Sequence, residues 1–122
     1  MTIAIIGASN DRSKFGNKSV RAYLNSGHTV FPVNLREETI EGLPAFRSLL
    51  DIPDDLDRVS MYLPPDKTLK TLEDIAKKGT KELFLNPGSE STEVIDKAHS
   101  LGVKTVVACS IIDIGETPAS YE

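Results

Sequence analysis

The chain has 122 residues, of which 39% are hydrophobic and 26% charged, and its formal net charge is −4. This length predicts one globular domain, and the acidic balance argues against general nucleic-acid binding, which needs a basic face. No apolar run approaches the ~20 residues that span a bilayer, and residues 1–7 lack a signal peptide's basic region. We therefore expect a cytoplasmic protein that does not bind a membrane.

Short apolar runs alternate with amphipathic stretches along the chain, as strands and helices do in α/β proteins. The runs predict strands at Ile3–Ile6, Thr29–Val33, Arg58–Leu63, Glu82–Leu85 and Lys104–Ala108. The amphipathic stretches predict helices at residues 16–26, 65–79 and 92–101. A loop at Ile40–Ala45 and a short helical turn around Arg47–Leu50 complete the expected elements. The tail, Ser110–Glu122, has no periodicity, so we expect it to pack on the domain or to be partly disordered.

Four of the five predicted strands are nearly continuous apolar runs, which is typical of parallel strands covered on both faces. Right-handed helical crossovers between such strands give a doubly wound sheet. We therefore predict an α/β fold, a single Rossmann-like domain over residues 1–109 with a five-stranded parallel sheet. Numbered along the chain, the strands are expected in the order 3-2-1-4-5. Ligands bind such sheets beyond the carboxyl ends of the strands.

The segment after the first predicted strand combines small residues with cations. Gly7 can adopt a positive φ and lets the backbone approach a ligand closely. Gly16 opens the next helix, whose N-terminus attracts anions. The segment predicts a pyrophosphate site, the alternative being an ordinary strand-to-helix turn with solvated charges. The candidate residues are Gly7, Ala8, Ser9, Arg12, Lys14, Phe15 and Gly16.

This segment matches neither common nucleotide-binding motif. The dinucleotide fingerprint needs a second glycine where Ser9 stands. A P-loop needs Gly-Lys-Ser/Thr, which does not follow at the required spacing.

The second predicted strand ends at Val33, Asn34 and Arg36, without the acidic residue that usually holds the ribose of NAD. Arginine suits a phosphate on the ribose, such as the 3′-phosphate of coenzyme A or the 2′-phosphate of NADP. A surface arginine paired with Glu37 or Glu38 is the alternative interpretation.

The third and fourth predicted strands also end in candidate ligand contacts. Leu63, Pro64 and Pro65 form a stiff apolar wall suited to an adenine ring, although proline also simply initiates helices. Asn86 and Gly88 lie at the same edge, where they face a pantetheine arm or form a plain turn.

The sequence offers no catalytic or metal-binding arrangement. His28 precedes the second strand, at the opposite edge, and His99 lies within the last helix without an evident partner. Cys109 is the only cysteine, which excludes an intrachain disulfide. It follows the last strand, where it either meets a ligand thiol or is a small buried hydrophobe. We therefore expect no enzymatic activity, no catalytic residue and no metal.

Several segments, taken together in their order, resemble the CoA-binding domain family, the fold of the N-terminal domain of the succinyl-CoA synthetase α subunit. They cover residues 2–109 and comprise Gly7–Ser9, Val30–Asn34, Gly42–Phe46, Asp57–Val59, Tyr62–Pro65 and 102–109. The resemblance implies that CoA contacts the 7–9 loop, Lys14 and the ends of the second and third strands.

The chain departs from the family pattern in three respects. Leu35 stands where many members have proline, and Asn86-Pro87-Gly88 replaces Gln-x-Gly. The synthetase's second domain, with its phosphorylated histidine, is absent. The resemblance thus implies binding of CoA without ligase chemistry.

Three functional hypotheses remain at this point. The leading one is a standalone protein that binds CoA or acyl-CoA and senses or delivers it. The second is an NAD(P)-binding, redox-sensing or oxidoreductase-like domain. The third is a non-catalytic subunit of a separately encoded acyl-CoA enzyme, in which case a protein partner exists.

Overall fold

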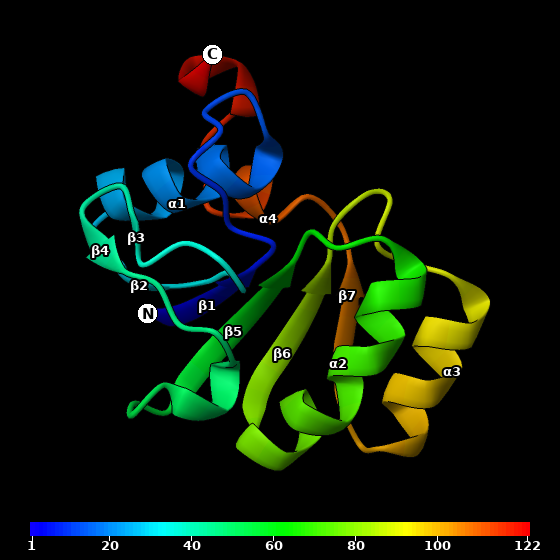
Figure 1. The fold of residues 1–122 in the computed structure, drawn as a ribbon. Helices are drawn as coiled ribbons and strands as arrows, with labels where there is room; N and C mark the ends of the chain where they lie inside the picture. The colour runs from blue at the N-terminus through cyan, green and yellow to red at the C-terminus, as the bar shows by residue number, and fades with distance from the viewer.

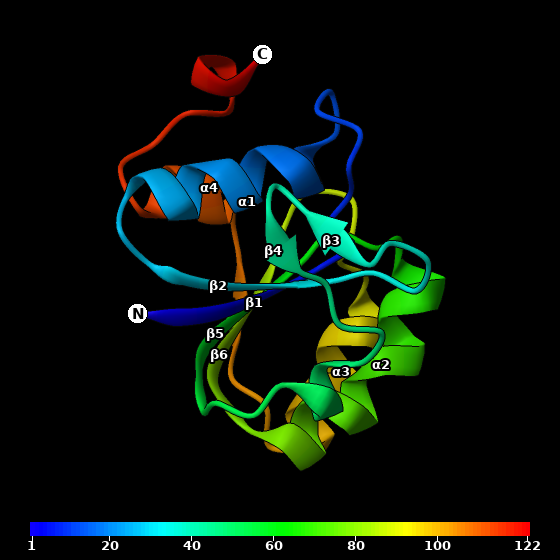
Figure 2. The same cartoon turned by 60° about the vertical axis from the view of Figure 1, so that its left-hand side comes forward.

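A parallel sheet of five strands runs through the middle of the molecule, and helices cover both of its faces (Figure 1, Figure 2). The structure, a computed structural model, describes all residues from Met1 to Glu122. The large sheet and its helices are β1 (Thr2–Ile6), α1 (Phe15–Asn25), β2 (Thr29–Val33), β5 (Leu56–Met61), α2 (Pro65–Lys78), β6 (Thr80–Leu85), α3 (Thr92–Ser100) and β7 (Thr105–Val107). Smaller elements are β3 (Thr39–Ile40), β4 (Leu43–Pro44), the 3-10 turn η1 (Leu49–Asp51), α4 (Ser110–Asp113) and the 3-10 turn η2 (Pro118–Tyr121).

The sheet separates two hydrophobic cores, which explains the continuous apolar runs. Along β1, Ile3 and Ile5 pack toward α1, where they meet Tyr23. Ala4 and Ile6 point to the other face and join the larger core beneath α2 and α3. Figure 2 shows α1 and α4 on one side of the sheet and α2 and α3 on the other. The prediction of an α/β domain with five parallel strands is confirmed.

The predicted strand order is wrong, because the third long strand lies beside the first. The observed order is β2-β1-β5-β6-β7, which is 2-1-3-4-5 in the predicted numbering. The connection after β2 buries Leu49 and Ile52 in the core on the α2 face. A right-handed crossover on that face returns past β1 and leaves β2 at the edge. Pro32 within β2 suits this edge position, because proline has no N–H to donate to a second neighbouring strand.

Two segments carry more structure than the sequence suggested. The predicted loop Ile40–Ala45 forms an antiparallel hairpin of β3 and β4, in which Glu41 has a φ of 49°. The tail packs on α1, since Tyr23 donates its hydroxyl to the carbonyl of Ser110 at 3.0 Å. The other element boundaries fall within two residues of those expected. None of the helices has the length and apolar character needed to cross a bilayer.

Candidate functional site

From β1 the chain adds β2 on one side, and it then crosses back to add β5, β6 and β7 on the other side. A crevice opens at the carboxyl ends of β1 and β5, where this change of direction occurs. β1 and β5 are neighbours, but the loop after β1 leads to α1 on one face and the loop after β5 leads to α2 on the other. Ligands of open α/β sheets bind at this kind of switch point. Two adjoining cavities lie there, and they share Gly7, Lys14 and Leu63.

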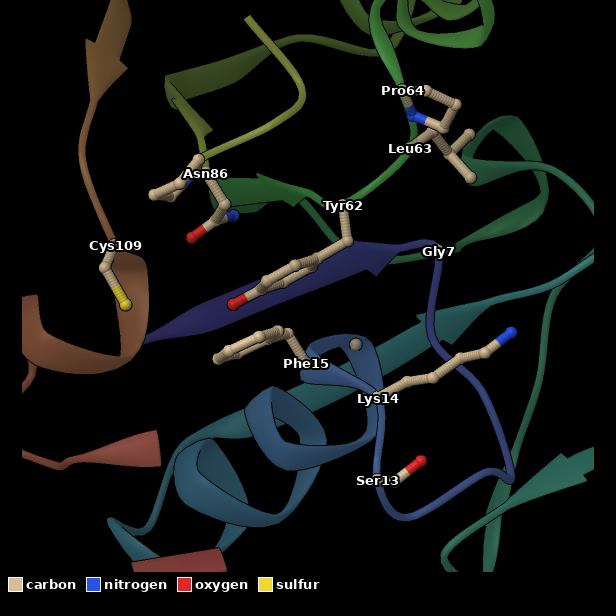
Figure 3. A pocket seen from close by; sticks show the side chains of 11 residues that line it. Gly7, Ser13, Lys14, Phe15, Tyr62, Leu63, Pro64, Asn86 and Cys109 are labelled. Atoms are coloured by element: carbon tan, nitrogen blue, oxygen red, sulfur yellow. The ribbon is translucent and has the colours of Figure 1, made fainter. Parts of the chain in front are cut away.

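The first cavity, here the aromatic pocket, has a volume of about 590 Å³. Figure 3 shows the Tyr62 and Phe15 side chains between Cys109 at one end and Lys14 at the other. Its walls are therefore largely apolar, with one cation at the end nearer the second cavity. The lining residues are Gly7, Ser13, Lys14, Phe15, Gly16, Tyr62, Leu63, Pro64, Asn86, Pro87 and Cys109.

The second cavity, here the basic cleft, has a volume of about 710 Å³ and gathers positive charge on an acidic protein. Five cations line it against one carboxylate, Asp74, and none of the five takes part in an ion pair. Two of them, Lys67 and Lys70, stand three residues apart and so share one side of α2. Unpaired cations around a concave site attract a ligand with several negative charges. The five are Lys14, Arg36, Arg47, Lys67 and Lys70.

Side chains from outside the loop after β1 hold its carbonyl groups. Asn34 donates its amide to the carbonyl of Ala8 at 2.8 Å, and Asn17 donates to that of Ser9 at 2.8 Å. The backbone N–H groups of Ala8, Ser9 and Asn10 meet no protein acceptor. Backbone N–H groups held in this way are suited to phosphate oxygens.

Asn34 acts on the loop rather than replacing the missing ribose-binding acid. Its side-chain oxygen accepts the N–H groups of Arg36 at 2.7 Å and Glu37 at 2.9 Å, while its amide holds Ala8. One side chain thus fixes the loops after β1 and β2 relative to each other, and Arg36, which belongs to this turn, lines the basic cleft.

A buried polar network fixes the far wall of the aromatic pocket. Asn86 donates to the hydroxyl of Ser60 and to the carbonyl of Met61, both at 2.9 Å, and accepts the N–H of Ser110 at 2.8 Å. The hydroxyl of Tyr62 lies 3.3 Å from that of Ser110. Burial raises the pKa of Tyr62, although the contact with Ser110 lowers it. Tyr62 therefore stays a neutral phenol at physiological pH.

All but three of the residues predicted for the site line one of the two cavities. Arg12 instead pairs with Glu41 at 2.9 Å, outside both cavities. Pro65 begins α2 and Gly88 lies in an exposed turn, and neither lines a cavity. The two histidines lie away from the cavities as well, since His28 contacts the N-terminal amine at 2.8 Å and His99 contacts Thr105 at 3.1 Å.

Four residues that line the cavities were not predicted from the sequence as site residues. Tyr62 directly precedes the predicted apolar wall, so its place at the strand end was a usable signal. Lys67 and Lys70 follow the same strand at helical spacing, which also placed them near the ligand edge. Arg47 had no such signal, because it reaches the cleft through the hairpin and η1, whose path depends on the strand order.

Comparison with protein families agrees with this geometry. The family model described as a CoA binding domain matches residues 1–114. The chain belongs to the CoA-binding domain family. Its relatives include the α subunit of acetate–CoA ligase [ADP-forming] II from Pyrococcus furiosus, 32% identical over 117 residues. The alignment takes in 85% of this chain and 25% of that protein, so this CoA-binding domain spans only about a quarter of its relative's length.

Solved structures similar to this CoA-binding domain fall into two groups. A conserved hypothetical protein from Pyrococcus furiosus has a TM-score of 0.85 and 32% identity, with 92% of this chain and 97% of that chain covered. The dinucleotide-forming acetyl-coenzyme A synthetase 1 of Ca. Korarchaeum cryptofilum, in complex with phosphate and ADP, has a TM-score of 0.78 and 31% identity. That match covers 88% of this chain but 25% of the synthetase. The domain thus has similar structures both as a whole small protein and as part of a ligase.

Proposed function

We propose that this CoA-binding domain binds coenzyme A or acyl-CoA across its two cavities. The observation that carries the proposal is the set of five unpaired cations in the basic cleft, which suits the pyrophosphate and the 3′-phosphate of CoA. The aromatic pocket adjoins this cleft through Lys14 and Leu63 and offers an apolar path for the uncharged pantetheine arm. Both cavities have volumes typical of small-molecule sites.

The end of β2 favours CoA over NAD. The ribose diol of NAD is usually held by a carboxylate at this position, and here Asn34 is already bonded to Ala8, Arg36 and Glu37. NADP is the competing ligand, because Arg36 and Arg47 also suit a 2′-phosphate. The family match to CoA-binding domains favours CoA between these two.

A thermal-shift titration with CoA, NAD and NADP tests this function. Ligand at 100 times its Kd adds roughly 2.7 kcal/mol to the free energy of unfolding. We expect CoA to raise the melting temperature and NAD to leave it unchanged. An equal or larger shift with NAD or NADP would show that the cleft serves a dinucleotide. Native mass spectrometry of ligand retained on purification identifies the acyl group, if one is present.

We further propose that the chain alone performs no ligase reaction and acts as a binding, sensing or delivering module. Ligation through a phosphoenzyme needs a nucleophile at the site, commonly a histidine, and a magnesium–nucleotide site. Both histidines lie outside the cavities, and no three potential metal ligands cluster in the structure. The similarity to a ligase α subunit favours one variant of this function, a non-catalytic chain that works with separately encoded partners.

An assay with acetate, succinate, CoA, magnesium and ³²P-labelled ATP tests the absence of ligase activity. We expect neither labelled protein nor acyl-CoA. Labelled protein together with acyl-CoA, both lost in His99→Ala, would overturn the binding-only function.

A further inference from the structure

Arg21 lines neither cavity, yet its guanidinium joins the loop after β1 to the C-terminal segment 117–121. Its Nη2 donates to the carbonyl of Arg12 at 2.9 Å and to that of Tyr121 at 2.7 Å. Its Nε donates to the side-chain oxygen of Asn17 at 2.7 Å. The Tyr121 ring centre lies 5.6 Å from the guanidinium carbon. Only a planar fork with several donors makes these three bonds at once.

Asn17 carries the connection from Arg21 into the basic cleft. Its side chain is fully buried, and its amide donates to the carbonyl of Ser9 at 2.8 Å and to Glu41 at 3.3 Å. Ser9 lines the basic cleft. An unbroken hydrogen-bonded path therefore runs from the Tyr121 carbonyl through Arg21 and Asn17 to the loop.

The path fixes the direction of a peptide group in that loop. In a trans peptide the carbonyl and the next N–H point in opposite directions. Because Asn17 holds the Ser9 carbonyl on the α1 side, the N–H of Asn10 points away from α1. This N–H has no protein acceptor, and its direction depends on Asn17 keeping its own orientation. Arg21 secures that orientation by occupying the Asn17 oxygen.

We propose that Arg21 and Asn17 are positioning residues for the CoA site, and that docking of segment 117–121 on α1 raises the affinity for CoA. The inference rests on the proposed function, that the crevice binds CoA. Linkage makes the coupling reciprocal, so bound CoA must also tighten the docked segment by the same factor. A partner that displaces the segment then weakens CoA binding by that factor.

Calorimetric titration of CoA into the variants Arg21→Ala and Arg21→Lys tests the positioning role. We expect the Kd for CoA to rise about fivefold or more in both variants, which corresponds to the lower end of the usual range of allosteric coupling. Lysine keeps the charge but cannot reproduce the three bonds. If Arg21→Lys bound CoA as tightly as the wild type, Arg21 would act only through its charge at a distance, and the proposal would be overturned. The control is Lys77→Ala, which also removes a positive charge but lies exposed on α2, lines neither cavity and should bind CoA normally.

Hydrogen exchange on the unmodified protein tests the coupling without any variant. With CoA bound, the amide of Ser120, which donates to the carbonyl of Thr117 at 3.1 Å, should exchange more slowly, together with its neighbours in η2. Unchanged exchange there while CoA is bound would overturn the coupling. Absence of CoA binding by the unmodified protein would overturn the proposed function instead, and the coupling with it.

Discussion

The carbonyl oxygen of Gly7 lies where a side chain at residue 16 would begin. A Cβ built on Gly16 would be 2.1 Å from that oxygen and 3.3 Å from the Cα of Ala8. The first turn of α1 therefore rests directly on the end of β1. Gly7 itself has a φ of 91°, and a Cβ there would lie 3.1 Å from that of Tyr62. The pair of glycines brings β1, α1 and β5 together, and the two cavities open beside their junction.

Gly16→Ala should destabilise the protein and abolish tight CoA binding. The added methyl group meets backbone, which cannot move away as a flexible side chain does. We expect a loss of about 3 kcal/mol in the free energy of unfolding, the upper end of the usual range for overpacking. Chemical denaturation and CoA calorimetry measure the two effects.

Gly27→Ala is the matched control for this variant. Gly27 has a φ of 83° and no atom within 4 Å of a built Cβ. Alanine there should cost about 1–2 kcal/mol through backbone strain alone and leave CoA affinity unchanged. Similar CoA affinities for the Gly16 and Gly27 variants would contradict the role assigned to the Gly7–Gly16 contact.

Asn34→Asp should weaken CoA binding without creating a site for NAD. The aspartate oxygen can still accept the N–H groups of Arg36 and Glu37, but it repels the carbonyl of Ala8, to which Asn34 now donates. It also places a negative charge beside the basic cleft. The lost bond and the added repulsion together should lower CoA affinity about tenfold, equivalent to roughly 1.4 kcal/mol. Parallel titrations with CoA and NAD give the measurement.

Asn34→Ala separates positioning from charge in this comparison. It removes the bond to Ala8 without adding a carboxylate, so its affinity should fall between those of the wild type and Asn34→Asp. If Asn34→Ala bound CoA as tightly as the wild type, the loop would not depend on Asn34.

Sequence reasoning found the strands, the helices and most of the crevice, because these follow from local patterns. The strand ends gave Gly7, Asn34 and Leu63 directly, since parallel strands bring their carboxyl ends to one edge. The order of strands depends on which face the β2–β5 connection covers. The burial of Leu49 and Ile52 places this connection on the α2 face. Both residues belong to an irregular segment whose sequence shows no periodicity.

The errors in predicting the site residues have the same cause, namely contacts made by irregular segments. Arg12 was expected at the ligand because of its charge, but the hairpin brings Glu41 to it. Arg47 reaches the cleft through the same irregular segment. Hydrogen-bonded contacts between loops, such as those of Asn17 and Arg21, leave no periodic trace in a sequence, so only the three-dimensional structure reveals them.

Protonation of Glu41 at low pH should loosen the loop after β1, because Arg12 of that loop pairs with Glu41. The hydrogen bond from Arg12 holds the pKa of Glu41 below its ordinary value of 4.5, and the contact with Asn17 lowers it further. A carboxylate with a depressed folded-state pKa stabilises the protein fully above 4.5, and the effect disappears as the pH falls through the folded-state pKa. The Arg12 side chain is 64% exposed, so solvent limits the effect to about 1 kcal/mol.

Glu41→Gln is the reference for that experiment, because it keeps the shape of the side chain and cannot titrate. The wild type should be more stable than Glu41→Gln at pH 7, and in denaturation curves the difference should shrink as the pH falls below 4.5. A difference in unfolding free energy that stays constant between pH 7 and pH 3 would mean that the Arg12–Glu41 pair contributes nothing through its charge.

Arg36→Ala should weaken CoA more than dephospho-CoA. Arg36 forms no ion pair, lines the basic cleft and leaves from the turn that Asn34 fixes, so it is the cation best placed for a phosphate on the ribose. Losing a charge-assisted hydrogen bond to the 3′-phosphate should reduce the binding free energy of CoA by about 1.5–3 kcal/mol. Dephospho-CoA lacks that phosphate, so its binding free energy should fall far less in Arg36→Ala.

Lys77→Ala is the control for Arg36→Ala, since Lys77 is exposed on α2 and lines neither cavity. Calorimetry on both ligands at two salt concentrations gives the answer: equal losses for the two ligands, both fading at high salt, would show that Arg36 acts only through long-range charge.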